Sequence, residues 1–303
     1  MKKKKYFYIE NIIKEIKLNK KYPQTSIAIN SKRFDIKKKI KLYSNNKYSS
    51  YWIIRELLLK HYLEVTEIKK NLYMRYGGDE IAHKILFDLG LQNKFSNYKI
   101  LNAGSGFGSD LIEQANLLPN SNFIGIEYNK KYADLSCKII HALGLESRIK
   151  IYCADLSSKY ALLKIREKEG LFDGVYSNLA VLHIKNKKLV YDNIYKLMKE
   201  NCKFRNEDYV SNSFTDIKFA EDKIGCQNLK TISEMHNIAE QVGYKNSLFE
   251  DLTSSWREFT KNRAFNYANM QDKKSKIKEN FLNDVALFFT SKNGSGGVFI
   301  HTK

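Results

Sequence analysis

The stretch Leu101–Gly108 reads LNAGSGFG, and it lies where a predicted strand over 98–103 gives way to a predicted helix over 110–118. Glycine at every second position lets the backbone approach a ligand closely, and the N-terminus of the following helix can meet a polar or anionic group. A dinucleotide-binding fingerprint requires G-x-G-x-x-G, but Ser109 stands where its third glycine would fall. The loop therefore predicts a ligand site, and the strands that follow must decide which ligand it holds.

Two acidic residues end the next two predicted strands. The strand NFIGIE ends in Glu127, 23 residues after Gly104, and RIKIYCAD ends in Asp155. A carboxylate at the first position can accept hydrogen bonds from both ribose hydroxyls, and one at the second can accept from an adenine amino group. Because ligands of open α/β sheets bind at the carboxyl ends of the strands, the loop and both acids predict one adenosine-containing ligand. The glycine spacing favours S-adenosylmethionine (SAM) over NAD.

Strands and helices alternate beyond residue 96, which predicts an α/β fold with a doubly wound, mostly parallel sheet. Strands are expected over 98–103, 122–127, 148–155, 172–180 and 202–210, and helices over 110–118, 132–145, 187–200, 231–242 and 254–268. The strand CKFRNEDYV (202–210) is unusually polar. The tail DVALFFTSKNGSGGVFIHTK (284–303) is expected to form two strands around a glycine-rich turn.

The series LNAGSGFG, IGIEY, CADL and FDGVYSN resembles, in this order, the motifs of class I SAM-dependent methyltransferases. The resemblance implies a Rossmann-like, seven-stranded sheet with helices on both faces and an antiparallel C-terminal hairpin, with S-adenosylhomocysteine as product. It implies cofactor contacts from Asn102, Gly104, Gly106, Glu127, Tyr128, Asp155, Leu156 and Ser177. Asn102 departs from the family pattern, in which an acid helps to hold the methionine amino group; an amide keeps one acceptor and loses the charge.

The charge is concentrated at the N-terminus, where residues 1–50 hold +12 of the net charge of +19. We expect a basic N-terminal extension over 1–50, a helical lid over 51–95 with helices at 51–70 and 79–89, and the methyltransferase domain over 96–303. The four cysteines form no CxxC pair, so no metal site is expected. No apolar run is long enough to span a membrane, and a cytoplasmic location is expected.

The fourth strand and its loop, SNLAVLHI (Ser177–Ile184), lack the prolines of the DNA amino-methyltransferase motif, so methylation of nucleic acid rests on charge alone. The surroundings resemble the phosphoethanolamine-type (phosphobase) N-methyltransferases instead. The matching features are YGG before the first helix of the fold, His183, Asp208–Tyr209 and Val242–Phe259. The resemblance implies that His183 acts at the acceptor with a lid tyrosine, for which we take Tyr51 ahead of Tyr62 and Tyr73. It also places Tyr73 and Tyr209 at the substrate.

A His–Tyr pair suits methyl transfer to an amine, because an ammonium must lose a proton before its nitrogen can attack. The phosphobase family carries a phosphate-gripping cluster of Arg, Lys and Tyr after the fifth strand. This chain has Gly225–Cys226–Gln227 there, so we expect a small-molecule amine without assigning a phosphate. Three alternatives stay open: an O- or C-methyltransferase of a small metabolite, an RNA or protein methyltransferase docking through the basic N-terminus, and a SAM-binding subunit without activity.

Overall fold

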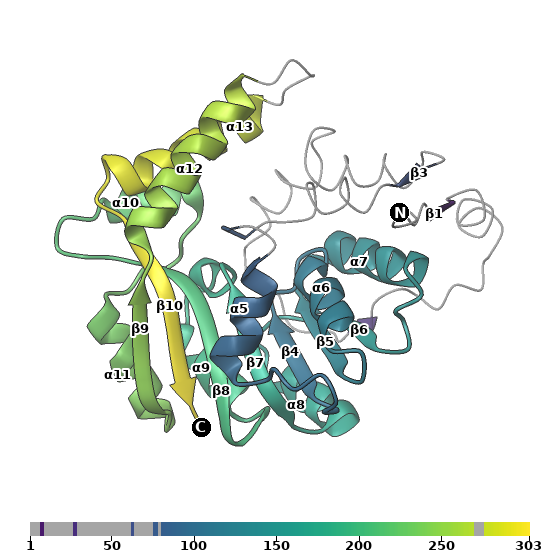
Figure 1. Ribbon diagram of the computed structural model, residues 1–303. Coiled ribbons are helices and arrows are strands. Elements are labelled where there is room, and N and C mark those ends of the chain that lie inside the picture. Colours follow the sequence, from purple (N-terminus) through teal and green to yellow (C-terminus); the bar gives the residue numbers. More distant parts are fainter. Residues whose placement is uncertain (1–6, 9–26, 29–61, 64–74, 78–79, 270–275) are drawn as a thin grey trace.

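The centre of the molecule is a sheet with the strand order β2-β6-β5-β4-β7-β8-β10-β9 (Figure 1). The computed structural model describes residues 7–8, 27–28, 62–63, 75–77, 80–269 and 276–303. The strands of the sheet are β2 (Ile27–Ala28), β4 (Lys99–Ala103), β5 (Asn122–Glu127), β6 (Ile149–Cys153), β7 (Phe172–Asn178), β8 (Met198–Val210), β9 (Lys245–Asp251) and β10 (Ser295–Thr302). Strands β4 to β10 form the predicted seven-stranded, mostly parallel sheet, which is confirmed. The two-residue β2 adds a parallel edge beside β6.

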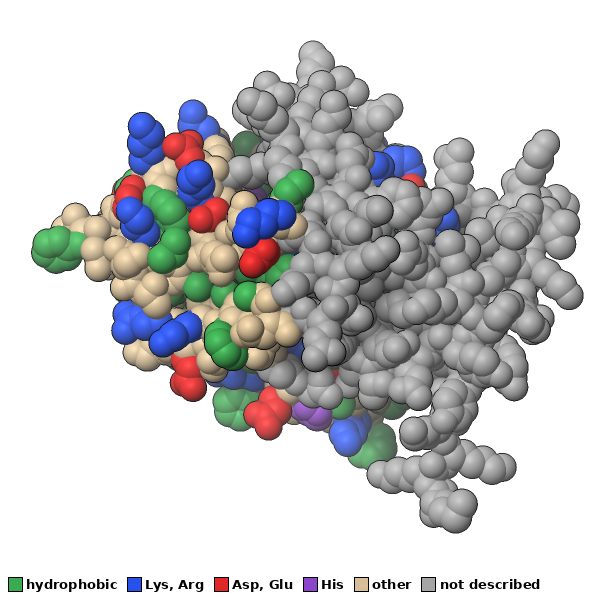
Figure 2. All heavy atoms as spheres, turned by 90° about the horizontal axis from the view of Figure 1, so that it is seen from above, with side chains coloured by type: hydrophobic (Ala, Val, Ile, Leu, Met, Phe, Trp, Pro, Cys, Tyr) green, Lys and Arg blue, Asp and Glu red, His purple; other side chains and the backbone are tan. Residues whose placement is uncertain are grey.

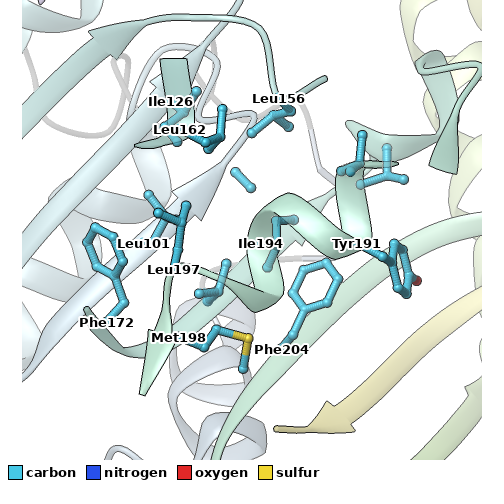
Figure 3. Packing of buried hydrophobic residues seen from close by; sticks show 14 of the residues in the cluster. Leu101, Ile126, Leu156, Leu162, Phe172, Tyr191, Ile194, Leu197, Met198 and Phe204 are labelled. Carbon is cyan, nitrogen blue, oxygen red and sulfur yellow. The ribbon is translucent and has the colours of Figure 1, made fainter. Parts of the chain in front are cut away.

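Helices cover both faces of the sheet, as predicted. On one face, α5 (Glu80–Leu89), α6 (Ser109–Leu117) and α7 (Lys130–Ala142) bury Ile85, Leu111 and Ile140 against the strands. On the other face lie α8 (Lys159–Glu169), α9 (Lys187–Tyr195) and α11 (Ile232–Val242). Their core includes Leu162, Tyr191 and Ile194, which pack with Leu101, Phe172 and Phe204 from the sheet (Figure 3). Helix α8 had no counterpart in the sequence analysis, although Ser158 caps it by accepting a hydrogen bond from the N–H of Ala161.

The polar strand predicted over 202–210 is confirmed as part of β8, which begins at Met198 and shortens the predicted helix before it to Tyr195. Its centre buries Arg205, Asn206, Glu207 and Asp208. A strand with four such residues inside the molecule requires partners for them, because an unpaired buried charge or amide is costly.

The C-terminal tail differs from the prediction. DVALFF belongs to helix α13 (Lys276–Thr290), and the antiparallel neighbours of β10 are β8 and β9. The buried residues of α13 are Leu282, Val285, Phe288 and Phe289. Their spacing of three, three and one is helical, whereas a short apolar run taken alone is equally consistent with a strand. The antiparallel C-terminal strands are thus confirmed, with β9 in place of the expected partner.

Helices α12 (Thr253–Ala268) and α13 are inserted between β9 and β10 and lie beyond the end where the parallel strands finish (Figure 1). The short α10 (Ile217–Phe219) and the π-helical turn η2 (Ala220–Ile224) lie beside them. This end of the molecule carries both signs of charge: basic and acidic side chains alternate over the described part of the face (Figure 2).

Most of the predicted N-terminal extension and lid lies outside the described residues. Within the predicted helix over 51–70, Tyr62–Leu63 form the two-residue strand β3, which pairs with β1 (Phe7–Tyr8), so the helix prediction is wrong at these two positions. Helix α5, inside the predicted lid range, packs on α6, β7 and β8. Among the described helices, none combines the length and the apolar character that crossing a bilayer requires.

Candidate functional site

A cavity of about 1480 Å³ lies between the carboxyl ends of the parallel strands and the helices α12 and α13. The loops after β4, β5, β6 and β7 contribute to its wall, and so do residues from both inserted helices. Open α/β sheets bind their ligands at this end, because the loops that follow the parallel strands meet there. The cavity is therefore where the predicted cofactor and acceptor residues should be compared with the structure.

The glycine loop after β4 forms part of the cavity wall. Gly104, Gly106 and Gly108 all have positive φ, at 91°, 55° and 76°. A Cβ on Gly104 would overlap the Cβ of Ala180, so only glycine fits there. The N–H groups of Gly104 and Ser105 donate to the carbonyl of Ile126 at 2.8 and 2.9 Å, which fastens the loop to β5. The glycine spacing in the sequence thus reflects both a backbone conformation and a close approach between two loops.

Glu127 ends β5 at the cavity wall and braces the glycine loop. Its Oε2 accepts from the N–H of Gly106 at 2.8 Å, and its Oε1 accepts from the N–H of Asn129 at 2.7 Å. Burial raises the pKa of Glu127, while these backbone donors act in the opposite direction. An ionised carboxylate has about four acceptor sites, more than its backbone donors occupy, so Glu127 can still accept from a ligand.

Asp155 and Asn102 provide acceptors at neighbouring strand ends. Asp155 follows β6, where its Oδ1 accepts from the N–H of Ser157 at 2.7 Å. The side chain of Asn102, at the end of β4, is only 2% exposed, and its Oδ1 has no hydrogen-bond partner among the described residues. Both residues line the cavity. A buried acceptor without a partner is costly, and a ligand that donates to Asn102 would remove that cost.

The other predicted cofactor residues are placed unequally. Tyr128 and Leu156 line the cavity beside Glu127 and Asp155. Ser177 is fully buried within β7 and is absent from the described cavity lining. Tyr51 and Tyr73 lie outside the described residues.

His183 lines the cavity from the 3₁₀ turn η1 (Val181–His183), which follows β7. Its Nδ1 lies 3.0 Å from the carbonyl oxygen of Gly225. Because a carbonyl can only accept, the geometry assigns the proton to Nδ1, and the neutral ring then carries its lone pair on Nε2. The histidine thus has the tautomer that a proton acceptor at Nε2 requires.

The predicted substrate residue Tyr209 lies in the cavity wall with a partner that the sequence analysis missed. The hydroxyls of Tyr76 and Tyr209 are hydrogen-bonded, and both side chains line the cavity. Trp256 of α12 and Phe289 of α13 pack around the pair, with ring centroids 5.2 and 6.4 Å from Tyr76. Burial raises the pKa of both tyrosines, so both hydroxyls stay protonated at neutral pH. The sequence signal that contains Tyr76 is the YGG motif, which indicates the family and assigns no role to this tyrosine.

Buried ion pairs fix the segment that carries Tyr76. Arg75 donates to Asp110 at 2.7 Å and to Glu113 at 2.8 Å, and both acids lie in the first turns of α6. Asp110 also accepts from the side-chain amide of Asn178 at 2.8 Å. These contacts join residues that are far apart in sequence at the end of β7.

Arg205 continues this network inside the sheet. It donates to the amide oxygen of Asn178 and to Asp88 at 2.9 Å each, and to Glu207 at 3.2 Å. The Arg205 side chain is fully buried. Removing one member of such a buried network leaves the charges of the others without a partner, which typically destabilises the fold by about 3–5 kcal/mol. The network therefore gives Arg205 and Glu207 of β8 their partners and holds Asn178 at the cavity.

The inserted helices contribute two basic side chains to the cavity wall, Arg263 of α12 and Lys278 of α13. Burial, assisted by the neighbouring Arg263, lowers the pKa of Lys278 to about 8. In the segment predicted to lack a phosphate cluster, Cys226 is fully buried and Gln227 lines the cavity.

The family model for the methyltransferase domain matches residues 94–280, which is more than half of the chain. The chain belongs to the methyltransferase family. SAM is the cofactor of this family, and most of the predicted cofactor residues lie in the cavity at the glycine loop. The Asn102 oxygen, which has no partner within the described part of the chain, the glycine cradle and the acceptor capacity of Glu127 fit such a cofactor.

Two curated relatives are similar to parts of this chain. Phosphoethanolamine N-methyltransferase 3 of Arabidopsis thaliana is 24% identical over 75% of this chain and 45% of its own length. An uncharacterised protein of Rickettsia prowazekii is 30% identical over 38% of this chain and 19% of its own length. This chain thus spans less than half the length of either curated relative.

A solved structure shows the same fold at low sequence identity. It is phosphoethanolamine N-methyltransferase 2 of Haemonchus contortus with phosphomonomethylethanolamine and S-adenosylhomocysteine. The TM-score is 0.67 at 15% identity, over 86% of this chain and 58% of that chain.

Proposed function

We propose that the protein transfers the methyl group of SAM to an amine nitrogen of a small-molecule acceptor and releases S-adenosylhomocysteine. The observation that carries this proposal is the position of His183 in the same cavity as the glycine loop, with its Nδ1 on the Gly225 carbonyl. An amine bound as ammonium has no lone pair, and a histidine base at the cavity wall can take its proton. The N-methyltransferases among the relatives support nitrogen as the acceptor atom.

The proposed contacts to SAM follow the strand ends. Glu127 accepts from the ribose hydroxyls, Asp155 accepts from the adenine amino group, and Asn102 accepts from the methionine amino group. Tyr128 and Leu156 flank the adenosine, and Gly104 and Gly106 let the loop backbone approach it. When bound, SAM supplies an electrophilic methyl group on a sulfonium. The chain contributes position and proton acceptance, because holding two reactants in line removes much of the entropic barrier.

The proposed acceptor site lies between His183 and the Tyr76–Tyr209 pair. Because the pKa of both tyrosines is raised, they act as hydrogen-bonding groups and aromatic walls, and His183 is left as the base. Their rings can attract an alkylammonium by cation–π contact, by roughly 0.5–2 kcal/mol. In this proposal Tyr76, rather than the predicted Tyr51, is the tyrosine that lies at the acceptor with His183. The role of Tyr51 stays a prediction.

The test of the function is a methylation assay with isotopically labelled SAM and paired acceptors. Ethanolamine and phosphoethanolamine form one pair, and 3-aminopropanol and its O-phosphate form another. We expect the label on nitrogen in at least one of these amines. Control alcohols with the same carbon chain and no amino group should take up no label. Phosphate-independent turnover would agree with the loss of the cluster at Gly225–Gln227. Label appearing on oxygen or carbon, or solely in added RNA or protein, would overturn the proposal.

The affinity for SAM is expected to fall on mild acidification. Burial raises the pKa of Glu127, so this side chain takes up a proton at a higher pH than an ordinary glutamate. Protonation removes acceptor sites that the ribose hydroxyls need, and SAM therefore binds best above the raised pKa. Calorimetric titrations with SAM from neutral to mildly acidic pH measure the effect. A Glu127→Gln variant should bind more weakly with a flatter pH dependence; an equally steep dependence in that variant would assign the effect elsewhere.

A further inference from the structure

We infer that the segment Gly225–Asn228 and the ammonium of Lys187 hold His183 in one position and one tautomer, so that they are positioning residues for methyl transfer. The inference rests on the proposed role of His183 as the base. It assigns a role to the segment at which the phosphobase family carries its phosphate-gripping cluster.

Three hydrogen bonds join this segment to the loop that carries His183. The carbonyl of Gly225 accepts from Nδ1 of His183 at 3.0 Å, and the N–H of Gln227 donates to the carbonyl of Leu182 at 2.7 Å. The side-chain amide of Asn228 donates to the carbonyl of Lys185 at 3.0 Å. The bonds thus span the loop from one side of His183 to the other, and they fix both its backbone and its ring.

The π-helical turn η2 aims the Gly225 carbonyl at the histidine. The carbonyl of Ala220 accepts from the N–H of Gly225 at 2.9 Å and from that of Cys226 at 3.1 Å. Gly225 ends the turn with a φ of 93°, a conformation that residues with a side chain rarely adopt. Single π turns are rare and occur frequently at functional sites. Here the extra residue in the turn brings a carbonyl, rather than a side chain, to His183.

Lys187, a buried residue that also lines the cavity, holds the same loop. Its Nζ donates to the carbonyls of Val181 and Ile184 at 3.1 and 3.4 Å, on either side of His183 in sequence. The residue is only 2% exposed. Burial lowers the pKa of Lys187, and the carboxylate of Asp208 acts in the opposite direction. Among the described residues, these two carbonyls are the hydrogen-bond acceptors of the Lys187 ammonium. The buried lysine therefore fixes the backbone of η1.

The combined effect is a histidine whose proton is committed to Nδ1. A ring with Nδ1–H bonded to a carbonyl presents a lone pair at Nε2, which is the state a base needs before each turnover. If the Gly225 carbonyl moved, the ring would exchange tautomers and orientations, and only a fraction of molecules would be ready to react. Positioning therefore acts on turnover and leaves SAM binding unchanged.

The first test compares Gly225→Ala with Gly144→Ala. Both glycines have positive φ, at 93° and 66°, so a side chain strains the backbone at either position; Gly144 follows the C-cap of α7, and a Cβ there would meet nothing within 4 Å. We expect Gly225→Ala to lower kcat about tenfold with an unchanged Kd for SAM, and Gly144→Ala to leave kcat near wild type. In ¹⁵N-histidine-labelled protein, the Nδ1–H signature of His183 should be lost in the first variant and kept in the second. An unchanged His183 spectrum in folded Gly225→Ala protein would overturn the inference.

The second test avoids backbone strain and serves if Gly225→Ala does not fold. Asn228 and Asn293 have φ of 52° and 53°, both are exposed, and each donates its side-chain amide to a backbone carbonyl. Replacing either by Gly removes one hydrogen bond and keeps the backbone conformation. We expect a severalfold fall in kcat for Asn228→Gly and none for Asn293→Gly; equal behaviour of the two would count against the inference.

The nitrogen spectrum separates this inference from the function it rests on. If no amine is methylated, or if His183→Ala retains full turnover, the proposed function fails whatever the spectrum shows. If amines are methylated and His183 is required, while both variants keep the wild-type spectrum and kcat, the positioning role alone fails.

Discussion

Replacing Glu127 by Gln and Asp155 by Asn together is expected to weaken SAM binding by about 10²- to 10⁴-fold. Each change removes the charge from one carboxylate at a strand end in the cavity wall. Hydrogen bonds to charged groups contribute roughly 1.5–3 kcal/mol each, so two of them correspond to this range. Isothermal titration calorimetry with SAM measures it.

A matched control for this double variant exists on the surface. Asp251 ends β9 and accepts from the N–H of Thr253 at 2.8 Å, the same local turn that Asp155 makes with Ser157. Glu200 is an exposed acid on β8. An Asp251→Asn, Glu200→Gln protein should bind SAM like wild type. If the cavity double variant also binds SAM like wild type, these two acids do not hold the cofactor.

Replacing His183 by Ala is expected to lower kcat by about 10²- to 10⁴-fold, the usual contribution of a positioned general base. The Kd for SAM should stay the same, because the proposed cofactor contacts come from the glycine loop and from Glu127 and Asp155. Initial rates with the amine identified in the acceptor panel measure the effect, and added imidazole should restore part of the activity. Full turnover in the variant would remove His183 from the reaction.

Much of the core fold was readable from local sequence patterns. The loop LNAGSGFG, the acids Glu127 and Asp155 and the alternation of strands and helices predicted the parallel sheet, because each depends on residues within a few positions of one another. The prediction of a strand at DVALFF in the tail is wrong, because the local pattern there is ambiguous. DVALFF is as apolar as a buried strand, and it became the end of α13 because Val285, Phe288 and Phe289 pack against the aromatic cluster around Tyr209.

Local sequence patterns predict one part of the candidate site and not the other. The predicted cofactor residues lie at strand ends, where the sequence has glycines and acids. The acceptor side depends on long-range contacts: Tyr76 meets Tyr209 across 133 positions, and His183 meets Gly225 across 42. No periodicity or motif predicts that two such distant residues will be in contact. The resemblance to the phosphobase enzymes indicates instead the lid tyrosines and a missing phosphate cluster.

LNAGSGFG, the two acids and the alternation of strands and helices by themselves indicate a parallel α/β sheet and predict a site for SAM at its carboxyl edge, because the backbone geometry of a strand–turn–helix unit is a local property of the chain. The tertiary structure alone decided what surrounds the acceptor. It brought Arg75, Asp110, Asn178 and Arg205 into one buried network, and it turned the π turn at Gly225 toward His183. The reason is physical: buried charges and carbonyls must find partners, and which partners they find depends on how distant segments pack.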